Sequence, residues 1–251
     1  MGVYGITDVI EVVPRRLHLL RFPVGQAYLW DDGDELTLVD AGAAGAGAEI
    51  ADAVRALGRD PREVRRIVVT HFHEDHAGGA GEFAALSGAQ VWAHPLDAPF
   101  VRGERPGPAP VFEDWERPLH AEALKLLPPP PTDPVLPCEV RELTDGDVLD
   151  CGGGARVVAV PGHTDGSIAL HLPHHGVLFT GDAVAASPLD GQVMLGVLNL
   201  DRRRAVDSFR TLAALDSDVA CFGHGDPVTS GAAAALRSVA ARLDDAAQTP
   251  L

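Results

Sequence analysis

The feature that most constrains this chain is a cluster of metal-binding side chains directly after a short apolar run. Four residues within six positions carry such side chains: His71, His73, Asp75 and His76. Imidazole and carboxylate groups suit zinc and the neighbouring divalent metals. The apolar run predicts a strand over 67–70 that delivers these residues to a sheet edge, and a helix over about 76–87 that leads away. The first two side chains can then face one point, and the last two can face a second point nearby.

Three more potential ligands follow at wide spacing, each after a short apolar run: His163, Asp182 and His224. Taken singly, each is typical of a structural histidine or a turn residue, and the first cluster alone could be a histidine-rich surface loop. Their joint order favours a metal site instead. Upstream, Asp40 ends a predicted strand over 36–39, where its carboxylate either orients a ligand imidazole or caps the loop 41–45.

These residues resemble a known family. The stretch 71–76 is similar to the HxHxDH signature of the metallo-β-lactamase-fold hydrolase superfamily. Four other elements follow the order of that family: VDAG at 39–42, with Ala41 where the family has Thr, PGHT at 161–164, GD at 181–182 and GHG at 223–225. The resemblance runs from about residue 20 to 230, which is nearly the whole chain.

The resemblance implies the fold, the cofactors and the reaction. It implies an α/β (α+β) fold, a four-layer αββα sandwich, and we expect one domain over 1–251. It assigns two divalent ions, zinc first with iron or manganese as alternatives, to these ligands: His71, His73 and His163 for one ion, Asp75, His76 and His224 for the other, and Asp182 bridging both. A metal-bridging hydroxide would attack the substrate, and Asp75 would hold this nucleophile and pass on a proton as the catalytic residue.

The sequence motifs say less about which branch of the superfamily the chain resembles. Two-zinc β-lactamases would be expected to carry a Cys ligand, which the ligand set here lacks. Glyoxalase-II-type thioesterases add a C-terminal helical part, and lactonases often place a Tyr near the bridging Asp. We therefore predict a small hydrolase of an ester, lactone, thioester or amide bond. Two alternatives stay open: a persulfide dioxygenase with a single iron, and a metal-binding member without catalysis.

A proline-rich segment over about 104–137 interrupts the alternation of strands and helices. It is too apolar for a free linker, so we predict an insertion with one helix over 113–126, packed over the site mouth or against a second copy of the chain. Phe112 and Trp115 in this insertion are candidate substrate-pocket residues, as is His94 at the end of a strand over 90–93. The alternatives are a surface excursion without a role and a histidine that only forms hydrogen bonds.

Net charge and composition limit the classes of molecule that this chain can bind. The formal net charge of −16 argues against nucleic acid or an anionic membrane, because the basic clusters at 62–66 and 202–204 are short and typical of solvated helix faces. We expect a small-molecule substrate, with a second copy of the chain as a candidate partner. Three widely spaced cysteines indicate a reducing compartment, and Cys221 is expected to be a buried thiol. Without a signal peptide or a membrane-length apolar run, cytoplasmic location is expected.

The remaining pattern predicts an irregular lead-in over 1–14, followed by short strands and helices in each half. Strands are expected over 17–22, 26–30, 147–150, 155–160, 168–172, 177–180 and 219–222, and helices over 46–57, 201–215 and 228–243.

Overall fold

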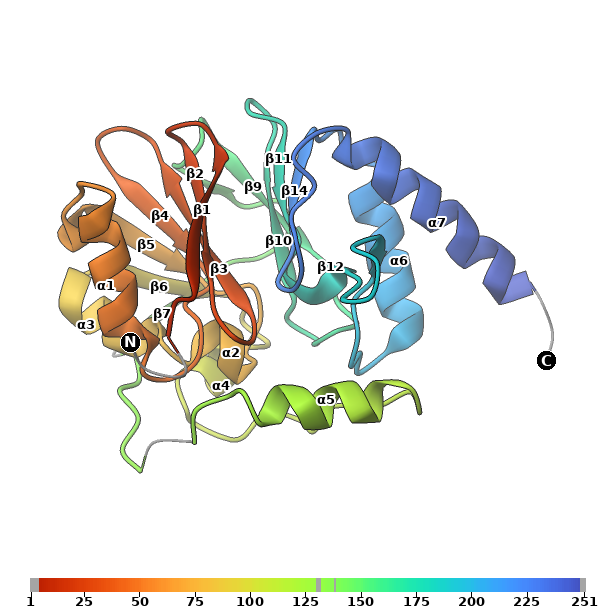
Figure 1. Ribbon diagram of the computed structural model, residues 1–251, viewed down its shortest axis with the longest axis horizontal. Helices are drawn as coiled ribbons and strands as arrows, with labels where there is room; N and C mark the ends of the chain where they lie inside the picture. The colour runs from red at the N-terminus through yellow and green to blue at the C-terminus, as the bar shows by residue number, and fades with distance from the viewer. Residues whose placement is uncertain (1–4, 130–131, 138, 249–251) are drawn as a thin grey trace. The chain divides into compact units, whose positions relative to one another are not determined.

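The computed structural model describes residues 5–129, 132–137 and 139–248. The chain divides into two compact units, Met1–Leu143 and Thr144–Leu251, which are described separately below (Figure 1). Whether they form the single predicted domain stays a prediction. Two residues of the proline run, 130 and 131, lie outside the described residues, as does Cys138.

The first unit is built on a seven-stranded sheet in which every strand lies beside its neighbour in sequence. Its strands are β1 (Asp8–Val13), β2 (Leu17–Arg21), β3 (Gln26–Asp31), β4 (Leu36–Val39), β5 (Val64–Val68), β6 (Gln90–Ala93) and β7 (Val140–Glu142). The first four strands are antiparallel, and β4 to β7 are parallel. The carboxyl ends of β4 to β7 therefore meet at one edge of the sheet, where binding sites of parallel sheets usually form.

Short helices connect the parallel strands of this unit: α1 (Ala46–Ala56), η1 (Pro61–Glu63), α2 (Glu74–Ala77), α3 (Ala80–Ser87), α4 (Ala98–Val101) and α5 (Glu116–Leu124). Helices α1 and α3 pack against each other and cover one face of the sheet (Figure 1). Ile50, Val54 and Phe83 are fully buried there with the inward side chains of β4 to β6. This apolar core fixes the carboxyl-end edge of the sheet.

The second unit contains a five-stranded sheet in the order β14-β11-β10-β9-β8 and a two-stranded ribbon of β12 and β13. Its elements are β8 (Val148–Leu149), β9 (Ala155–Ala159), β10 (Ile168–Leu172), β11 (Val177–Phe179), η2 (Gly181–Ala183), β12 (Val184–Ala186), β13 (Val193–Leu195), α6 (Arg202–Ala213), β14 (Val219–Cys221) and α7 (Ala232–Gln248). Helices α6 and α7 pack together and bury Phe209 and Leu236 with the sheet. Strand β10 is antiparallel to β9 and β11, and β14 is parallel to β11, so β9, β11 and β14 all run in one direction.

The structure corrects several of the predicted elements; the final helix, predicted over 228–243, is α7, because Val228 forms a β-bridge with Ala220 and the helix begins only at Ala232. The expected irregular lead-in is wrong for the described part, because β1 pairs with β2 as the outer strand of the sheet. Strand β5 begins at Val64 and ends at Val68, since the N–H of Thr70 binds the Asp40 carboxylate instead of continuing the ladder. The helix predicted over 76–87 is two helices, α2 and α3, separated at Gly78 and Gly79.

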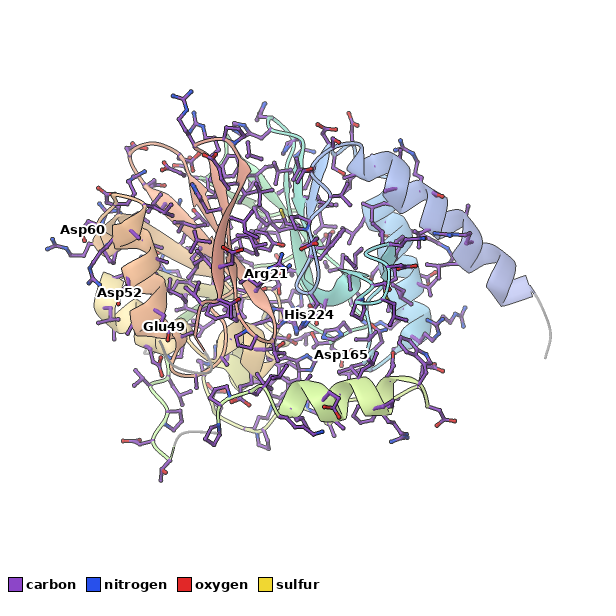
Figure 2. All side chains as sticks on the ribbon, in the orientation of Figure 1. Arg21, Glu49, Asp52, Asp60, Asp165 and His224 are labelled. Atoms are coloured by element: carbon purple, nitrogen blue, oxygen red, sulfur yellow. The ribbon has the colours of Figure 1, made fainter. Side chains whose placement is uncertain are left out.

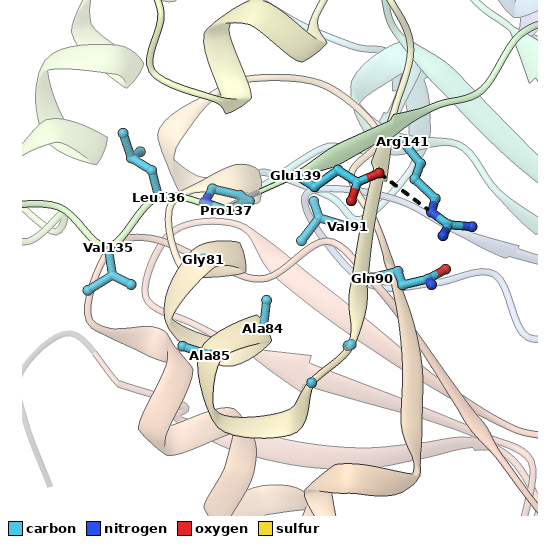
Figure 3. A pocket seen from close by; sticks show the side chains of 12 residues that line it. Gly81, Ala84, Ala85, Gln90, Val91, Val135, Leu136, Pro137, Glu139 and Arg141 are labelled. Atoms are coloured by element: carbon cyan, nitrogen blue, oxygen red, sulfur yellow. Dashed lines mark ion pairs between the residues drawn. The ribbon is translucent and has the colours of Figure 1, made fainter.

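The insertion contains α5, as predicted, and both of its ends contact the rest of the first unit. At its start, Gly107 lies so close to the Phe72 ring that a Cβ there would be 2.1 Å from a ring carbon. At its end, a Cβ on Gly81 of α3 would lie 2.0 Å from the carbonyl oxygen of Val135. Beside this second contact, a groove of about 290 Å³ is lined by α3, β6 and the residues Val135, Leu136, Pro137, Glu139 and Arg141 (Figure 3).

Charged side chains cover the surface of both units, and Asp52 and Asp60 point outwards from the first (Figure 2). Many arginines are neutralised locally, as Arg62 is by Asp60 and Arg204 by Asp165. The Arg62 guanidinium hydrogen-bonds the Asp60 carboxylate and lowers its pKa to about 2. In the described part of the chain, none of the helices is long and apolar enough to cross a membrane.

Candidate metal centre

In the first unit, four predicted ligands lie at the carboxyl-end edge of the sheet. His71 and His73 follow β5 in the loop before α2, and Asp75 and His76 belong to α2 itself. The ring centroid of His71 is 4.8 Å from that of His73 and 4.2 Å from that of His76. The Nε2 atom of His76 is 3.5 Å from Oδ2 of Asp75. Local folding thus brings these four side chains together.

Asp40 organises the buried part of this cluster. Its Oδ1 accepts the Thr70 N–H at 2.7 Å, and its Oδ2 accepts the Thr70 hydroxyl at 2.8 Å. Oδ2 is also 2.9 Å from Nδ1 of His76, and the Thr70 hydroxyl is 3.1 Å from Nδ1 of His71. Because a carboxylate can only accept, this network assigns a hydrogen to Nδ1 of both histidines and directs their Nε2 atoms as ligands.

Asp40 also has a distinctive backbone conformation. Its φ of 61° lies in the left-handed region, which aspartate and asparagine adopt more readily than most other residues. Its N–H donates to the carbonyl oxygen of Val68, and the next N–H, that of Ala41, donates to the carbonyl oxygen of His76. The carboxylate therefore turns back from the end of β4 towards the loop that carries the ligands.

The tip of the β2–β3 hairpin lies against Asp75. A Cβ on Gly25, whose φ is +69°, would be 2.8 Å from the backbone oxygen of Asp75 and 3.1 Å from its Oδ2. A glycine is thus required here both for its conformation and for the close approach of the two segments. The hairpin consequently restricts where the Asp75 carboxylate can lie.

In the second unit, three predicted ligands gather at one edge of the five-stranded sheet. They follow β9, β11 and β14, whose carboxyl ends share that edge: His163, Asp182 and His224. The Asp182 Oδ2 atom is 3.5 Å from Nε2 of His163 and 3.2 Å from Nε2 of His224. Two imidazole nitrogens thus converge on one carboxylate.

The His163 ring is oriented by the protein backbone. Its Nδ1 is 2.9 Å from the carbonyl oxygen of Val197, which assigns the hydrogen to Nδ1 and leaves Nε2 facing Asp182. The turn after His163 is fixed by Ser167, whose hydroxyl accepts the Thr164 N–H at 3.0 Å. His163 is buried, whereas the side chain of His224 is 35% exposed.

The predicted substrate-pocket residues lie in the first unit. His94 follows β6, and its Nδ1 accepts the Leu96 N–H at 3.2 Å, while desolvation lowers its pKa. Phe112 contacts the ring of His120 and the guanidinium of Arg117. Trp115 precedes α5 and is 52% exposed. Their role towards a substrate stays a prediction.

Two ionisable residues near the ligands in sequence, Glu74 and Cys221, differ in their exposure to solvent. The side chain of Glu74 is exposed, yet partial desolvation and the negative charge of Asp75 raise its pKa. Cys221 is buried, as predicted, and burial raises the pKa of its thiol.

The sequence prediction offered Asp40 as a support for a ligand imidazole, and its carboxylate contacts His76, but it missed the other residues that support the ligands. Thr70 adjoins the first ligand, and its hydroxyl could have been suspected from that position alone. The Val197 carbonyl and the buried carboxylate of Asp97, which accepts the Phe72 N–H at 3.0 Å, leave no such trace. Asp97 precedes the helix α4, so its residue type is explained equally well by a helix start.

The donor set in each unit fits metal ions. The ligand atoms are imidazole nitrogens and carboxylate oxygens, which zinc, iron and manganese accept. The opposite nitrogens of His71, His76 and His163 are held by a hydroxyl, a carboxylate and a carbonyl oxygen. Such partners commonly fix metal-ligating histidines in one tautomer.

Comparison with protein families supports this assignment. The model of the family described as "Metallo-beta-lactamase superfamily" matches residues 20–224, which contain all seven predicted ligands. The chain belongs to this superfamily. The prediction from the sequence motifs is therefore confirmed.

Curated relatives in the superfamily include hydrolases. The chain is 26% identical over 241 residues to a probable metallo-hydrolase of Bacillus subtilis, YflN, covering 91% of this chain and 85% of the relative. It is 30% identical over 178 residues to a hydroxyacylglutathione hydrolase of Cereibacter sphaeroides, covering 70% of this chain. The match spans only 54% of that hydrolase. These likenesses support a metal-binding hydrolase.

Solved structures from the superfamily share the fold. A metallo-beta-lactamase family protein from Thermus thermophilus matches with a TM-score of 0.67 and 28% identity, covering 95% of this chain and 81% of that chain. The subclass B3 metallo-beta-lactamase MEM-A1 from a soil metagenome matches with a TM-score of 0.68 and 21% identity, covering 99% and 100%. The predicted α/β class and metallo-β-lactamase fold are confirmed.

Proposed function

We propose that the protein is a dinuclear metal-dependent hydrolase that cleaves an ester, lactone, thioester or amide bond in a small molecule. The observation that carries this proposal is the paired arrangement of ligands and their supports. In each unit, an imidazole Nε2 atom faces a carboxylate while the opposite ring nitrogen is held by an oxygen of the protein, from Asp40 in the first unit and from Val197 in the second. A structural histidine needs no such arrangement, whereas a metal ligand does.

The proposed centre holds two metal ions. The first ion is assigned to His71, His73 and His163, the second to Asp75, His76 and His224, and Asp182 to both. Two bound ions would supply Lewis acidity and lower the pKa of a bound water molecule to about 7. Superfamily membership and the order of the motifs support this assignment.

The residues of the chain have separate tasks in this proposal. Asp40 and the Val197 carbonyl keep His76 and His163 in the tautomers that leave Nε2 free to bind metal. Asp75, restricted by the hairpin glycine, would hold the attacking water and later pass a proton to the leaving group. Because the protein positions these groups before substrate binds, little reorganisation is needed during the reaction.

We also propose a small-molecule substrate and a cytoplasmic location. The net charge of −16 and the local neutralisation of arginines disfavour polyanionic partners. The hydroxyacylglutathione hydrolase relatives make a thioester the first bond to test, although they align over only part of their length.

The test combines metal analysis with a hydrolysis screen. The purified protein should contain two ions per chain and cleave at least one of four probes: an aryl ester, an acyl-homoserine lactone, S-lactoylglutathione or a cephalosporin. Asp182→Ala should lower the metal content and abolish turnover, whereas Asp165→Ala, an exposed carboxylate paired with Arg204, should change neither. One iron per chain with oxygen consumption would overturn the proposal in favour of the oxidative alternative.

A further inference from the structure

A buried carboxylate in the first unit has no task in the proposed reaction. Asp97 is 1% exposed and lies in the turn between β6 and α4. Its N–H donates to the carbonyl oxygen of His94 at 2.9 Å, and its own carbonyl oxygen accepts the Phe100 N–H at 2.9 Å. These backbone hydrogen bonds fix the turn, so the side chain is presented from a rigid position.

The carboxylate reaches the loop that follows the neighbouring strand. Its Oδ2 accepts the N–H of Phe72 at 3.0 Å, although the two residues are 25 positions apart. Strands β5 and β6 are parallel neighbours with Val68 opposite Trp92, so their carboxyl ends adjoin. The contact therefore links the two adjacent strand ends directly.

Phe72 is the residue between the ligands His71 and His73, and it is held at a second point. Its ring lies 4.7 Å from that of Phe100 in α4, and Gly107 closes over it without room for a Cβ. The backbone and the ring of one residue are thus fastened to the same turn and helix. Because a peptide bond is planar, fixing the Phe72 N–H fixes the carbonyl side of His71 as well.

We propose that Asp97 is a positioning residue for the His71 and His73 pair, acting through the Phe72 N–H. The inference rests on the proposed function, because it assumes that these histidines bind a metal ion. A buried carboxylate carries a large desolvation cost, so it is retained where its hydrogen bonds offset that cost. A charge-assisted hydrogen bond is also shorter and stronger than one to a neutral acceptor, which limits movement of the loop.

A purely structural role is the alternative, and variants separate the two. Asp97→Ala removes the acceptor, and Asp97→Asn keeps one oxygen that can accept the same N–H. Ser87→Ala is the matched control, because Ser87 is also buried in this unit and bonds backbone groups of Phe83 and Ala89, away from the ligands. All three variants can be compared for thermal stability as well as for metal binding.

The experiment titrates the metal-free protein with Co²⁺, recording its d–d absorption, and measures Zn²⁺ affinity by competition with a chelator. Asp97→Ala should weaken Zn²⁺ binding by about 10- to 100-fold, the range for supporting groups of metal ligands, and change the cobalt spectrum. Asp97→Asn should restore most of the affinity, and Ser87→Ala should leave both readouts unchanged.

The proposal is overturned if Asp97→Ala lowers stability as Ser87→Ala does but retains the affinity and the spectrum of the unmodified protein. If Asp97→Ala does not fold, Asp97→Glu decides, because it moves the carboxylate by one methylene: a changed cobalt spectrum supports the proposal and an unchanged one overturns it. If the unmodified protein binds no metal, the proposed function fails instead, which distinguishes the two failures.

Discussion

Replacing Asp40 by asparagine should separate protein stability from ligand orientation. Asparagine adopts the left-handed backbone conformation as readily as aspartate, so the turn after β4 should survive. The carboxylate accepts three hydrogen bonds, two from Thr70 and one from His76, whereas the amide has a single oxygen and donates through its nitrogen. At least one donor must therefore change its partner.

The size of the effect follows from these contacts. With the amide oxygen towards the Thr70 N–H, the NH₂ group faces Nδ1 of His76 and drives this ring to the other tautomer, with hydrogen on Nε2. A buried donor left without an acceptor costs about 1–3 kcal/mol, so Asp40→Asn should remain folded within a typical stability of about 5–15 kcal/mol. Asp40→Ala loses all three hydrogen bonds, or about 3–9 kcal/mol by the same rule, and should be much less stable than Asp40→Asn.

Nitrogen NMR of the histidine rings would detect the tautomer change, and chelator competition would measure metal affinity. We expect Zn²⁺ binding to weaken by about 10- to 100-fold in Asp40→Asn. Asp31→Asn serves as the control, because Asp31 also accepts a backbone N–H and pairs with an arginine, but at the far end of β3. An Asp40→Asn protein with an unchanged His76 tautomer and unchanged affinity would refute the orienting role.

Three further predictions concern single positions. Gly25→Ala forces a Cβ against Asp75 at a positive φ, so urea unfolding should show a loss of about 1–2 kcal/mol together with reduced metal content; an unaltered unfolding midpoint would contradict the close approach. Gly107→Ala should displace the Phe72 ring, and its aromatic NMR resonances should shift; unshifted resonances would show that the contact is absent in solution. Burial raises the pKa of the Cys221 thiol in the folded state above its unfolded-state value of about 8.5. The contribution of the neutral thiol to the free energy of unfolding is therefore complete below that unfolded-state pKa, and it is lost as the pH rises above it. Cys221→Ala should remove a slope of up to about 1.4 kcal/mol per pH unit between roughly pH 9 and 10, measured as the difference in unfolding free energy from the unmodified protein.

The sequence predicted best those elements whose boundaries are set by local residues. Strands β4, β6 and β10 begin and end where the apolar runs do, because turn residues or a proline follow soon after. The break between α2 and α3 was missed, although two consecutive glycines mark it. A Cβ on Gly78 or Gly79 would collide with the loop after β4, and such a tertiary approach cannot be seen in a helical periodicity.

The candidate ligands could be predicted because a metal centre demands particular residue types in a particular order. Apart from Asp40, their supports could not be predicted, because a backbone carbonyl such as that of Val197 exists at every position. Asp97 and Phe72 illustrate the same limit, since their hydrogen bond depends on two strands lying side by side. The sequence motifs thus identify the candidate ligands, whereas most of the groups that orient them can be identified only from the tertiary structure.

The insertion is fastened where it leaves and where it rejoins the first unit, at Gly107 and Val135, while β6 and β7 pair directly with each other. Its length can therefore change without altering the register of the sheet, and doubling a flexible loop costs only about 0.6 kcal/mol in closure entropy. Selection, or a protein engineer, can therefore replace the segment between these two points and keep the sheet unchanged. Chimaeras joined at these two points would test whether the insertion affects substrate preference.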